Sequence, residues 1–211
     1  MTTGRASGNA RGTGEKRQFN SLAALNRALL QAPLYIKGAG RIVAGEGPVG
    51  AAIAFVGEQP GDQEDQAGAP FVGPAGQLLD QALAQAGIDR SACYVTNAVK
   101  QFKFLQRGKR RLHERPKADE IAHYRSWLAA ELGLVAPKVI VALGATALHA
   151  LSDQRLSVTA NRGPLPLLGR SGYATIHPSA ILRMTGQAER QAALRAFVED
   201  LRKIRRLGQA D

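Results

Sequence analysis

The sequence contains a single cysteine, Cys93, among 211 residues. One thiol cannot form an intramolecular disulfide. It also cannot supply the several thiolates that a structural zinc site or an iron-sulfur cluster requires from one chain. We therefore expect a protein without disulfides and without a metal centre of that kind.

Long apolar runs are also missing. None approaches the roughly 18 to 20 residues that a membrane-spanning helix needs, and residues 1–19 lack the apolar stretch of a secretory signal. We therefore expect a cytoplasmic protein that does not bind membranes. Aromatic residues are sparse, at 5%, but 45% of the residues are hydrophobic, which is enough to build the core of one domain.

Acidic residues are outnumbered by basic ones, 17 against 28, which gives a formal net charge of +11. Nearly all of this excess lies in residues 1–19 and residues 100–117. We interpret residues 1–19 as a flexible basic arm and residues 20–211 as a single domain. Such concentrated positive charge favours binding to nucleic acid. For the segment 100–117, a solvated basic loop without a partner is the alternative.

From residue 20 onward, short apolar runs alternate with amphipathic stretches, which predicts an α/β fold. Crossover rules then give a three-layer αβα sandwich around a central four-stranded parallel sheet with all strands in one direction. The expected strands are 52–56, 93–96, 139–143 and 173–176, and the expected helices are 76–86, 118–132, 145–151 and about 188–207. Ligands of such sheets bind beyond the carboxyl ends of the strands. Glu58, Asn97 and His177 follow three of these strands and should therefore meet at one edge.

The first strand is followed by a glycine-rich turn, GEQPGDQED, which begins at Gly57. Such a turn leaves backbone N–H groups free and allows the close approach of a phosphate or a flat ring. A dinucleotide site would have the same strand, turn and helix order, but its GxGxxG pattern and the Walker lysine pattern are both absent.

Three further motifs accompany this turn: PFVGPAG at 70–76, VTN at 95–97 and HPSAILR at 177–183. With them, the chain resembles the uracil-DNA glycosylase superfamily over about residues 30–205, in the family's order and spacing. The motif that contains Glu58 is similar to that of the iron-sulfur, family-four branch. The segment KRRLH at 109–113 resembles the KRRIH loop of the DNA-crosslinking UdgX subfamily, with Leu112 in place of isoleucine. In that subfamily the loop histidine attacks the sugar and leaves the protein covalently bound to DNA.

The chain departs from the family at the positions of the cluster ligands. The resemblance places them at Leu29, Ala32, Gln101 and Tyr124, none of which is a cysteine. We therefore expect no iron-sulfur cluster and no other metal. We also expect Leu29, Ala32 and Tyr124 to fill the vacated space with apolar surface.

The resemblance implies a pocket for an extruded uracil, held by Gln59, Gly61, Asp62, Phe71 and Asn97, with Gln59 alternatively orienting the loop or the ring. Phe71 would stack on the base, and the Asn97 amide can donate to a uracil carbonyl and accept from the ring N–H, whereas cytosine presents the reverse pattern. The alternatives are a core role for Phe71 and a turn-capping role for Asn97.

The expected catalytic residues are Glu58, His113 and His177. Bond cleavage leaves negative charge on uracil, which His177 would stabilise by donating a hydrogen bond. A neutral His113 would attack the sugar, and its cationic neighbours favour the neutral ring by repulsion. Glu58 would accept the proton, position a water or stabilise the cationic sugar. A solvated histidine in a basic loop is the alternative for His113.

The expected DNA contacts are Lys109, Arg110, Arg111, Ser179, Leu182 and Arg183. Leu182 and Arg183 resemble the family's wedge, which implies that Leu182 fills the gap left by the extruded base while Arg183 binds a phosphate. The sequence thus predicts a monomeric uracil-DNA glycosylase that acts on single- or double-stranded uracil-containing DNA, with covalent capture by His113. A turnover glycosylase and an inactive DNA-binding module on the same scaffold are the alternatives.

Overall fold

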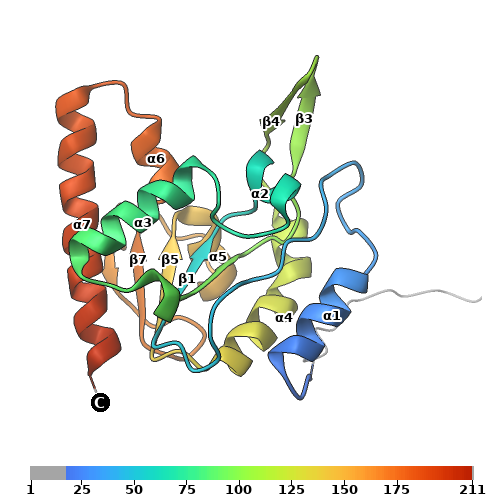
Figure 1. Ribbon diagram of the computed structural model, residues 1–211, viewed down its shortest axis with the longest axis horizontal. Helices are drawn as coiled ribbons and strands as arrows, with labels where there is room; N and C mark the ends of the chain where they lie inside the picture. The colour runs from blue at the N-terminus through green and yellow to red at the C-terminus, as the bar shows by residue number, and fades with distance from the viewer. Residues whose placement is uncertain (1–17, 211) are drawn as a thin grey trace, which may run out of the picture.

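A computed structural model describes residues 18–210 and shows an α/β fold with one mostly parallel central sheet (Figure 1). In spatial order the strands are β2 (Tyr94–Asn97), β1 (Ile53–Gly57), β5 (Val139–Leu143), β7 (Gly172–Thr175) and β6 (Gly163–Pro164). The first four are parallel to one another. The predicted four-stranded parallel core is therefore confirmed, and each predicted strand lies within one residue of the observed one.

The expectation that every strand points the same way is wrong for β6, which pairs antiparallel with β7. Only residues 165–171 connect these two strands. A parallel crossover needs about a dozen residues or more, so this short link forces an antiparallel return.

Helices cover both faces of the sheet (Figure 1). One layer contains α3 (Pro74–Ala86), α6 (Pro178–Leu182) and α7 (Gln187–Gln209), and the other contains α1 (Leu22–Gln31), α4 (Ala118–Val135) and α5 (Ala145–Ser152). Two short elements, α2 (Asp62–Ala67) and the 3-10 turn η1 (Arg90–Ala92), lie in the connections.

The residues of β5 show how the sheet joins two cores. Val139, Val141 and Leu143 pack into the core shared with α3 and α7. Ile140 and Ala142 pack into the core shared with α1 and α4. A strand buried on both faces is continuously apolar, which is why the run VIVAL was recognisable in the sequence.

The basic segment 100–117 is not a simple loop. It forms a β-hairpin from β3 (Phe104–Arg107) and β4 (Arg110–His113), which projects from the body of the molecule (Figure 1). Gly108 has φ +59 in the tight turn, a left-handed conformation that glycine adopts without steric cost.

The predicted basic arm, residues 1–19, lies almost wholly outside the residues that the structure describes, which begin at residue 18. Phe19, at the end of that predicted arm, stacks on Trp127 of α4 with ring centroids 5.7 Å apart. The packed part of the chain therefore begins before residue 20. No helix within residues 18–210 is long and apolar enough to cross a membrane.

Candidate active site

A cleft of about 1100 Å³ opens at the carboxyl ends of the parallel strands. Its lining includes all the residues predicted for catalysis and for base binding, and three of those predicted to contact DNA: Glu58, Gln59, Gly61, Asp62, Phe71, Asn97, His113, His177, Ser179, Leu182 and Arg183. Lys109, Arg110 and Arg111 do not line it. The sequence motifs are thus brought together in one place.

Adjacent strands each contribute one polar side chain to this cleft. Asn97 ends β2, Glu58 follows β1, Thr146 lies just beyond β5, and His177 lies just beyond β7. Gly57 is paired with Asn97 in the sheet, and a Cβ atom at Gly57 would overlap both the Asn97 amide and the Phe71 ring. Only glycine leaves room for these two side chains to approach the strand end.

Phe71 holds an unusual backbone conformation, with φ +57. For a residue other than glycine, the left-handed region costs roughly 1–2 kcal/mol. Its ring is largely buried and lies 6.3 Å, centroid to centroid, from the ring of His177. A Cβ atom at Gly76 would overlap the Phe71 backbone, so that glycine permits the conformation. Strain retained at a cleft-lining residue is typical of functional sites.

Asn97 is only 4% exposed, and its side-chain amide has no hydrogen-bond partner among residues 18–210. Thr96, next to it, is fixed by a buried polar network. The Lys100 Nζ lies 2.5 Å from both the Thr96 hydroxyl and a carboxylate oxygen of Glu131, and all three residues are fully buried. The end of β2 is therefore rigidly held, while the Asn97 amide remains open to a ligand.

This network corrects the expectation that the segment 100–117 is a set of free positive charges. Lys100 is paired with Glu131, and Lys103 lies 3.1 Å from a Glu120 carboxylate oxygen while being only 7% exposed. Burying an unpaired charge is costly, so the acidic partners explain why these lysines lie inside the fold.

His177 caps the N-terminus of α6. Its Nδ1 accepts a hydrogen bond of 3.1 Å from the Ser179 N–H. Burial lowers the pKa of His177 to about 4; Glu58 opposes this, while Arg183 and His113 add to it. The ring is therefore neutral at neutral pH, and because Nδ1 is an acceptor, the single ring proton lies on Nε2.

Glu58 lies between Thr146 and His113. The Thr146 hydroxyl donates to Oε2 at 2.7 Å, and the His113 Nε2 lies 3.2 Å from Oε1. Burial raises the pKa of Glu58, but the hydrogen bonds from His113 and Thr146 lower it, and the net effect is a lowering. The net pKa is below its usual value, so Glu58 is a carboxylate at neutral pH.

Gln59 fastens the base of the hairpin. Its Nε2 donates to the backbone carbonyls of Lys103 and Glu114, each at 3.1 Å, and its Oε1 accepts from the Lys103 N–H at 3.3 Å. The resemblance placed the Gln59 amide on uracil, but here this amide is hydrogen-bonded to the residues just before β3 and just after β4. In this position it holds His113 over Glu58.

Arg111 fastens the hairpin to α2. Its Nε lies 2.5 Å from Asp62 Oδ1, Nη1 is bonded to Asp65, and the guanidinium lies over the rings of Phe102 and Phe104. Asp62 is therefore already paired within the protein. The Gly61 N–H is likewise engaged, because it donates to Glu64 at 3.0 Å.

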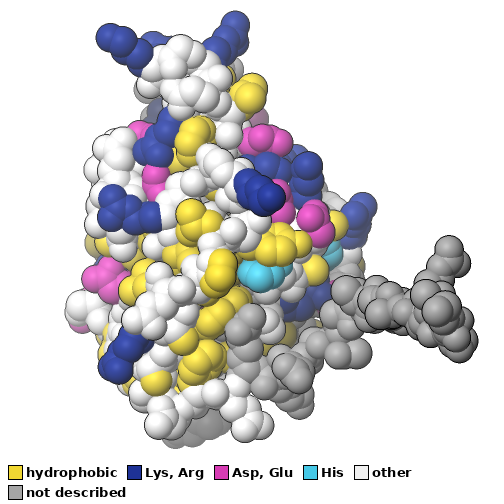
Figure 2. Space-filling model, turned by 90° about the vertical axis from the view of Figure 1, so that its right-hand side faces the viewer, with side chains coloured by type: hydrophobic (Ala, Val, Ile, Leu, Met, Phe, Trp, Pro, Cys, Tyr) yellow, Lys and Arg dark blue, Asp and Glu magenta, His cyan; other side chains and the backbone are white. Residues whose placement is uncertain are grey.

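The remaining basic side chains of the hairpin point to solvent. Arg107, Lys109 and Arg110 are exposed, and Lys and Arg side chains project at the top of Figure 2, at the height of the hairpin in Figure 1. At the other side of the cleft Leu182 is half-buried, and Arg183 is exposed and donates to the Ser179 hydroxyl at 3.1 Å.

The positions of the family's cluster ligands do not fit an iron-sulfur cluster. Leu29 and Tyr124 are buried in the core and Ala32 packs against it, as expected for apolar filling. Gln101 is fully buried as well, but it is hydrogen-bonded: it accepts from the Tyr124 hydroxyl at 2.6 Å and from the Ile36 N–H at 3.0 Å. These side chains offer no thiolate and satisfy one another.

Elsewhere in the described chain, Cys93 is buried in the opposite core, and no group of three or more histidine, cysteine or acidic residues is arranged to hold a metal ion.

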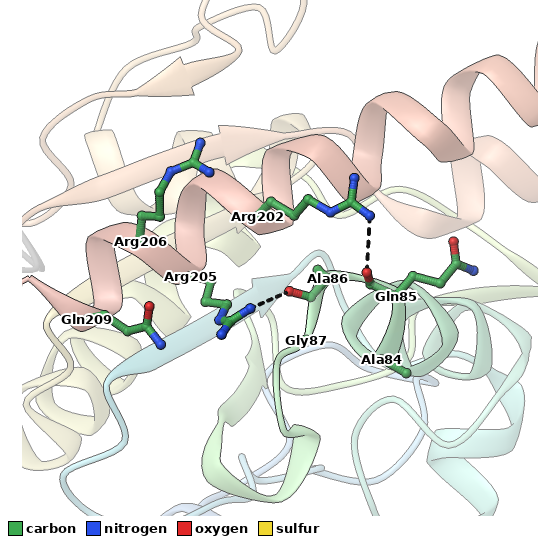
Figure 3. Close-up of a pocket in the computed structure, with 8 residues that line it drawn as sticks. All are labelled: Ala84, Gln85, Ala86, Gly87, Arg202, Arg205, Arg206 and Gln209. Carbon is green, nitrogen blue, oxygen red and sulfur yellow. Dashed lines mark hydrogen bonds between the residues drawn. The ribbon is translucent and has the colours of Figure 1, made fainter.

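A second hollow lies far from this chemistry, between α7 and the end of α3 (Figure 3). Arg202 donates to the carbonyl of Gln85, and Arg205 donates to that of Ala86. The arginines thus neutralise the negative end of α3, which is a structural role.

Thr146 was missed in the sequence. The polar residues that follow three of the predicted strands identified Glu58, Asn97 and His177, but the strand 139–143 was passed over. The same rule applied to LGATA, which begins at the end of that strand, would have found Thr146.

Comparisons with known proteins show the family to which the chain belongs. A family model described as the Uracil DNA glycosylase superfamily matches residues 44–202. The chain is 40% identical to a Type-4 uracil-DNA glycosylase of Thermotoga maritima, over 78% of this chain and 81% of that protein. It is 34% identical to a Type-4 uracil-DNA glycosylase of Pyrobaculum aerophilum, over 72% and 80% of the two chains. A Type-5 uracil-DNA glycosylase of the same organism is 31% identical, over 59% and 50%.

Proposed function

Because the chain belongs to the uracil-DNA glycosylase superfamily, we propose that it excises uracil from DNA by cleaving the bond between the base and deoxyribose. The observation that carries this proposal is the convergence of Asn97, Glu58 and His177 on one cleft from adjacent strands. A protein that only bound DNA would have no need of a pocket built for a single base.

The pocket matches the chemistry of uracil. Phe71 supplies a flat, buried ring on which an extruded base can stack, which is worth about 1–3 kcal/mol in related contacts. The open amide of Asn97 can donate to a carbonyl and accept from the ring N–H. Since cytosine presents the opposite donor and acceptor pattern, Asn97 would select uracil.

His177 would stabilise the departing base. When the bond from C1′ to N1 breaks, its electron pair leaves with uracil and negative charge develops on a carbonyl oxygen. A neutral ring with its proton on Nε2 can donate to that oxygen without giving up the proton. The hydrogen bond from the Ser179 N–H to Nδ1 keeps the ring in this tautomer.

His113 would capture the sugar. A lone pair of the ring nitrogen that faces C1′ forms the new bond as the bond to N1 breaks. The resulting imidazolium then loses its remaining N–H proton to Glu58, which releases it to solvent, and the uracil anion takes up a proton from solvent. Glu58 is placed for this role, since its Oε1 lies 3.2 Å from His113 Nε2. Its negative charge also stabilises the cationic sugar.

The exposed side chains around the cleft would hold the DNA. Lys109 and Arg110 are free to bind phosphates, because they are exposed on the hairpin. Leu182 would take the place of the extruded base in the stack, and Arg183, with Ser179, would bind a phosphate beside it. Arg111 would act indirectly, by fixing the hairpin through Asp62 and Asp65.

We further propose that this chemistry proceeds without an iron-sulfur cluster. No step above needs one, and the hydrogen bond between Tyr124 and Gln101 supports this view. Purified protein should therefore contain no stoichiometric iron and show no cluster absorbance. Stoichiometric iron would contradict this part of the proposal.

The experiment that tests the function combines a denaturing gel with an assay for free uracil, on single-stranded DNA that contains one uracil. A band shift that survives heat and detergent, together with released uracil, is expected. Uracil release without a shift would indicate ordinary hydrolysis. Intact substrate would refute excision and favour the binding module.

His113→Ala is the decisive variant, and His123→Ala is its control. His123 lies on α4 and stacks on Tyr35 rather than lining the cleft. We expect His113→Ala to abolish the shifted band and His123→Ala to retain it. A covalent band that persists in His113→Ala would place the nucleophile elsewhere.

A further inference from the structure

Thr146 is the one hydroxyl that touches the Glu58 carboxylate among the described residues, and nothing in the sequence motifs pointed to it. Its Oγ1 donates to Glu58 Oε2 at 2.7 Å, across 88 positions of the chain. The other oxygen, Oε1, is the one that lies 3.2 Å from His113 Nε2. The two oxygens of one carboxylate therefore have separate partners.

The turn that carries Thr146 is built for close approach to the site. Gly144, the residue before α5, has φ +90, and a Cβ atom there would come within 3.1 Å of the His177 side chain. The Gly144 N–H donates to the Thr175 carbonyl at 2.9 Å. The start of α5 is thus held against the strand that precedes His177, while Thr146, two residues further, reaches Glu58.

We propose that Thr146 is a positioning residue for the excision reaction, which binds Oε2 of Glu58 so that Oε1 remains directed at His113. This inference rests on the proposed function. A carboxylate rotates freely unless one of its oxygens is held, and a charge-assisted hydrogen bond from a hydroxyl is strong enough to hold it. The same bond favours the ionised form, which is the form that accepts a proton.

The other charged groups around Glu58 do not duplicate this role. His113 approaches Oε1 from β4, and His177, which is neutral at neutral pH, approaches from the end of β7. Asp62 is paired with Arg111, and Glu64 accepts from the N–H groups of Gly61 and Gly73. Arg115 and Arg183 also line the cleft, but the hydrogen bonds that hold the Glu58 carboxylate come from Thr146 and His113.

The test compares Thr146→Val, which keeps the shape and removes the hydroxyl, with Thr146→Ser, which keeps the donor. Single-turnover excision is measured from acid to neutral pH at saturating uracil-containing DNA. For Thr146→Val we expect the rate to fall by roughly 10- to 100-fold, as when a hydrogen bond to a charged group is removed. Its acid limb should move to higher pH, since Glu58 then protonates more readily. Thr146→Ser should recover most of the rate and the wild-type profile.

A second measurement does not depend on activity. The Glu58 carboxyl is followed by carbon-13 NMR through a pH titration, with Glu58→Gln used to assign its signal. We expect a higher Glu58 pKa in Thr146→Val than in the wild type, in a protein that remains folded. An unchanged titration would overturn the positioning role, as would a slower Thr146→Val whose acid limb does not shift. Inactive wild-type protein would instead refute the proposed function, while the titration still decides whether Thr146 holds Glu58.

Discussion

Among single residues, the cleft keeps one ionisable group neutral and another negatively charged at neutral pH. His177 is neutral because burial lowers its pKa to about 4, and Glu58 is ionised because its hydrogen bonds outweigh its burial. Groups whose environments separate their protonation states in this way are typical of acid–base and electrostatic catalysis. Here the neutral ring would serve the base and the carboxylate would serve the sugar side.

Removing the His177 ring should slow excision strongly. We expect His177→Ala to reduce the single-turnover rate by about 10²- to 10³-fold, as for the removal of one donor to a developing oxyanion. The measurement is rapid-quench uracil release at saturating DNA. A rate equal to that of the wild type would show that uracil leaves without this donor.

The pH dependence should carry the same signature. A histidine with a lowered pKa becomes protonated only as the pH falls through that lowered value, here about 4. His177 should therefore leave the rate constant between about pH 5 and pH 8, where an ordinary histidine titrates. In the variant His113→Ala, any residual uracil release should be flat over this range. An inflection there that disappears in His177→Asn would contradict a neutral His177.

At the scale of elements, the hairpin β3–β4 determines where His113 lies. It projects from the sheet (Figure 1), yet Gln59 ties its base and Arg111 ties it to α2. The hairpin was not predicted, because a run of basic residues resembles a solvated loop and its strands are only four residues each. The partners that fix it, Asp62 and Asp65, lie more than 40 positions away in the chain.

Arg111 and Arg110 are neighbours with different expected roles. Arg111→Gln should lower the rate of His113 trapping at saturating DNA, by up to about 10²-fold, because a small displacement of a nucleophile is costly. Arg110→Gln should weaken DNA binding but leave trapping at saturation intact. Trapping rates measured over a range of DNA concentrations separate the two. Equal behaviour of both variants would contradict the anchoring role of Arg111.

The Gln101 side chain should be a local stability determinant. Gln101→Leu leaves the Ile36 N–H and the Tyr124 hydroxyl without their buried partner, at a cost of about 1–3 kcal/mol per unpaired group. Tyr124→Phe removes the hydroxyl that bonds Gln101 and the Tyr35 backbone, and should cost about 0.5–1.5 kcal/mol for each of these hydrogen bonds. Urea unfolding measures both, and added iron should change neither. Stabilisation of the wild type by iron would show that this region binds metal.

At the scale of the whole molecule, the sequence predicted what local patterns encode. The four parallel strands are continuous apolar runs such as VIVAL, and their carboxyl ends correctly located Glu58, Asn97 and His177. Strand β6 was not predicted, because glycine and proline, here Gly163 and Pro164, do not indicate a strand. Thr146 was missed because the strand-end rule was not applied to the strand 139–143, and the sheet order, which places β5 beside β1, then shows why it reaches Glu58.

The net charge overestimated the number of cations that are available to DNA. The formal count treated Lys100, Lys103 and Arg111 as available to DNA, whereas each is paired with a carboxylate inside the protein. Pairing of this kind joins residues distant in sequence, so composition cannot reveal it. The cations left for DNA on this segment are the exposed ones, such as Lys109 and Arg110.

This difference is measurable as a salt dependence. Replacing Lys109 and Arg110 together by glutamine should flatten the dependence of duplex affinity on salt, by about 0.9 for each phosphate that these two side chains neutralise. Fluorescence anisotropy over a range of salt concentrations gives the slope. An unchanged slope would place the phosphate-binding cations elsewhere on the surface.

The proposed mechanism requires one cleft to hold a uracil and to bring His113 to its deoxyribose. Mass spectrometry of wild-type protein incubated with a uracil-containing oligonucleotide, followed by peptide mapping, shows whether this capture occurs. We expect a species with the combined mass of the protein and the DNA less the uracil, with the sugar attached to His113. Unmodified protein together with DNA that still contains its uracil would contradict it.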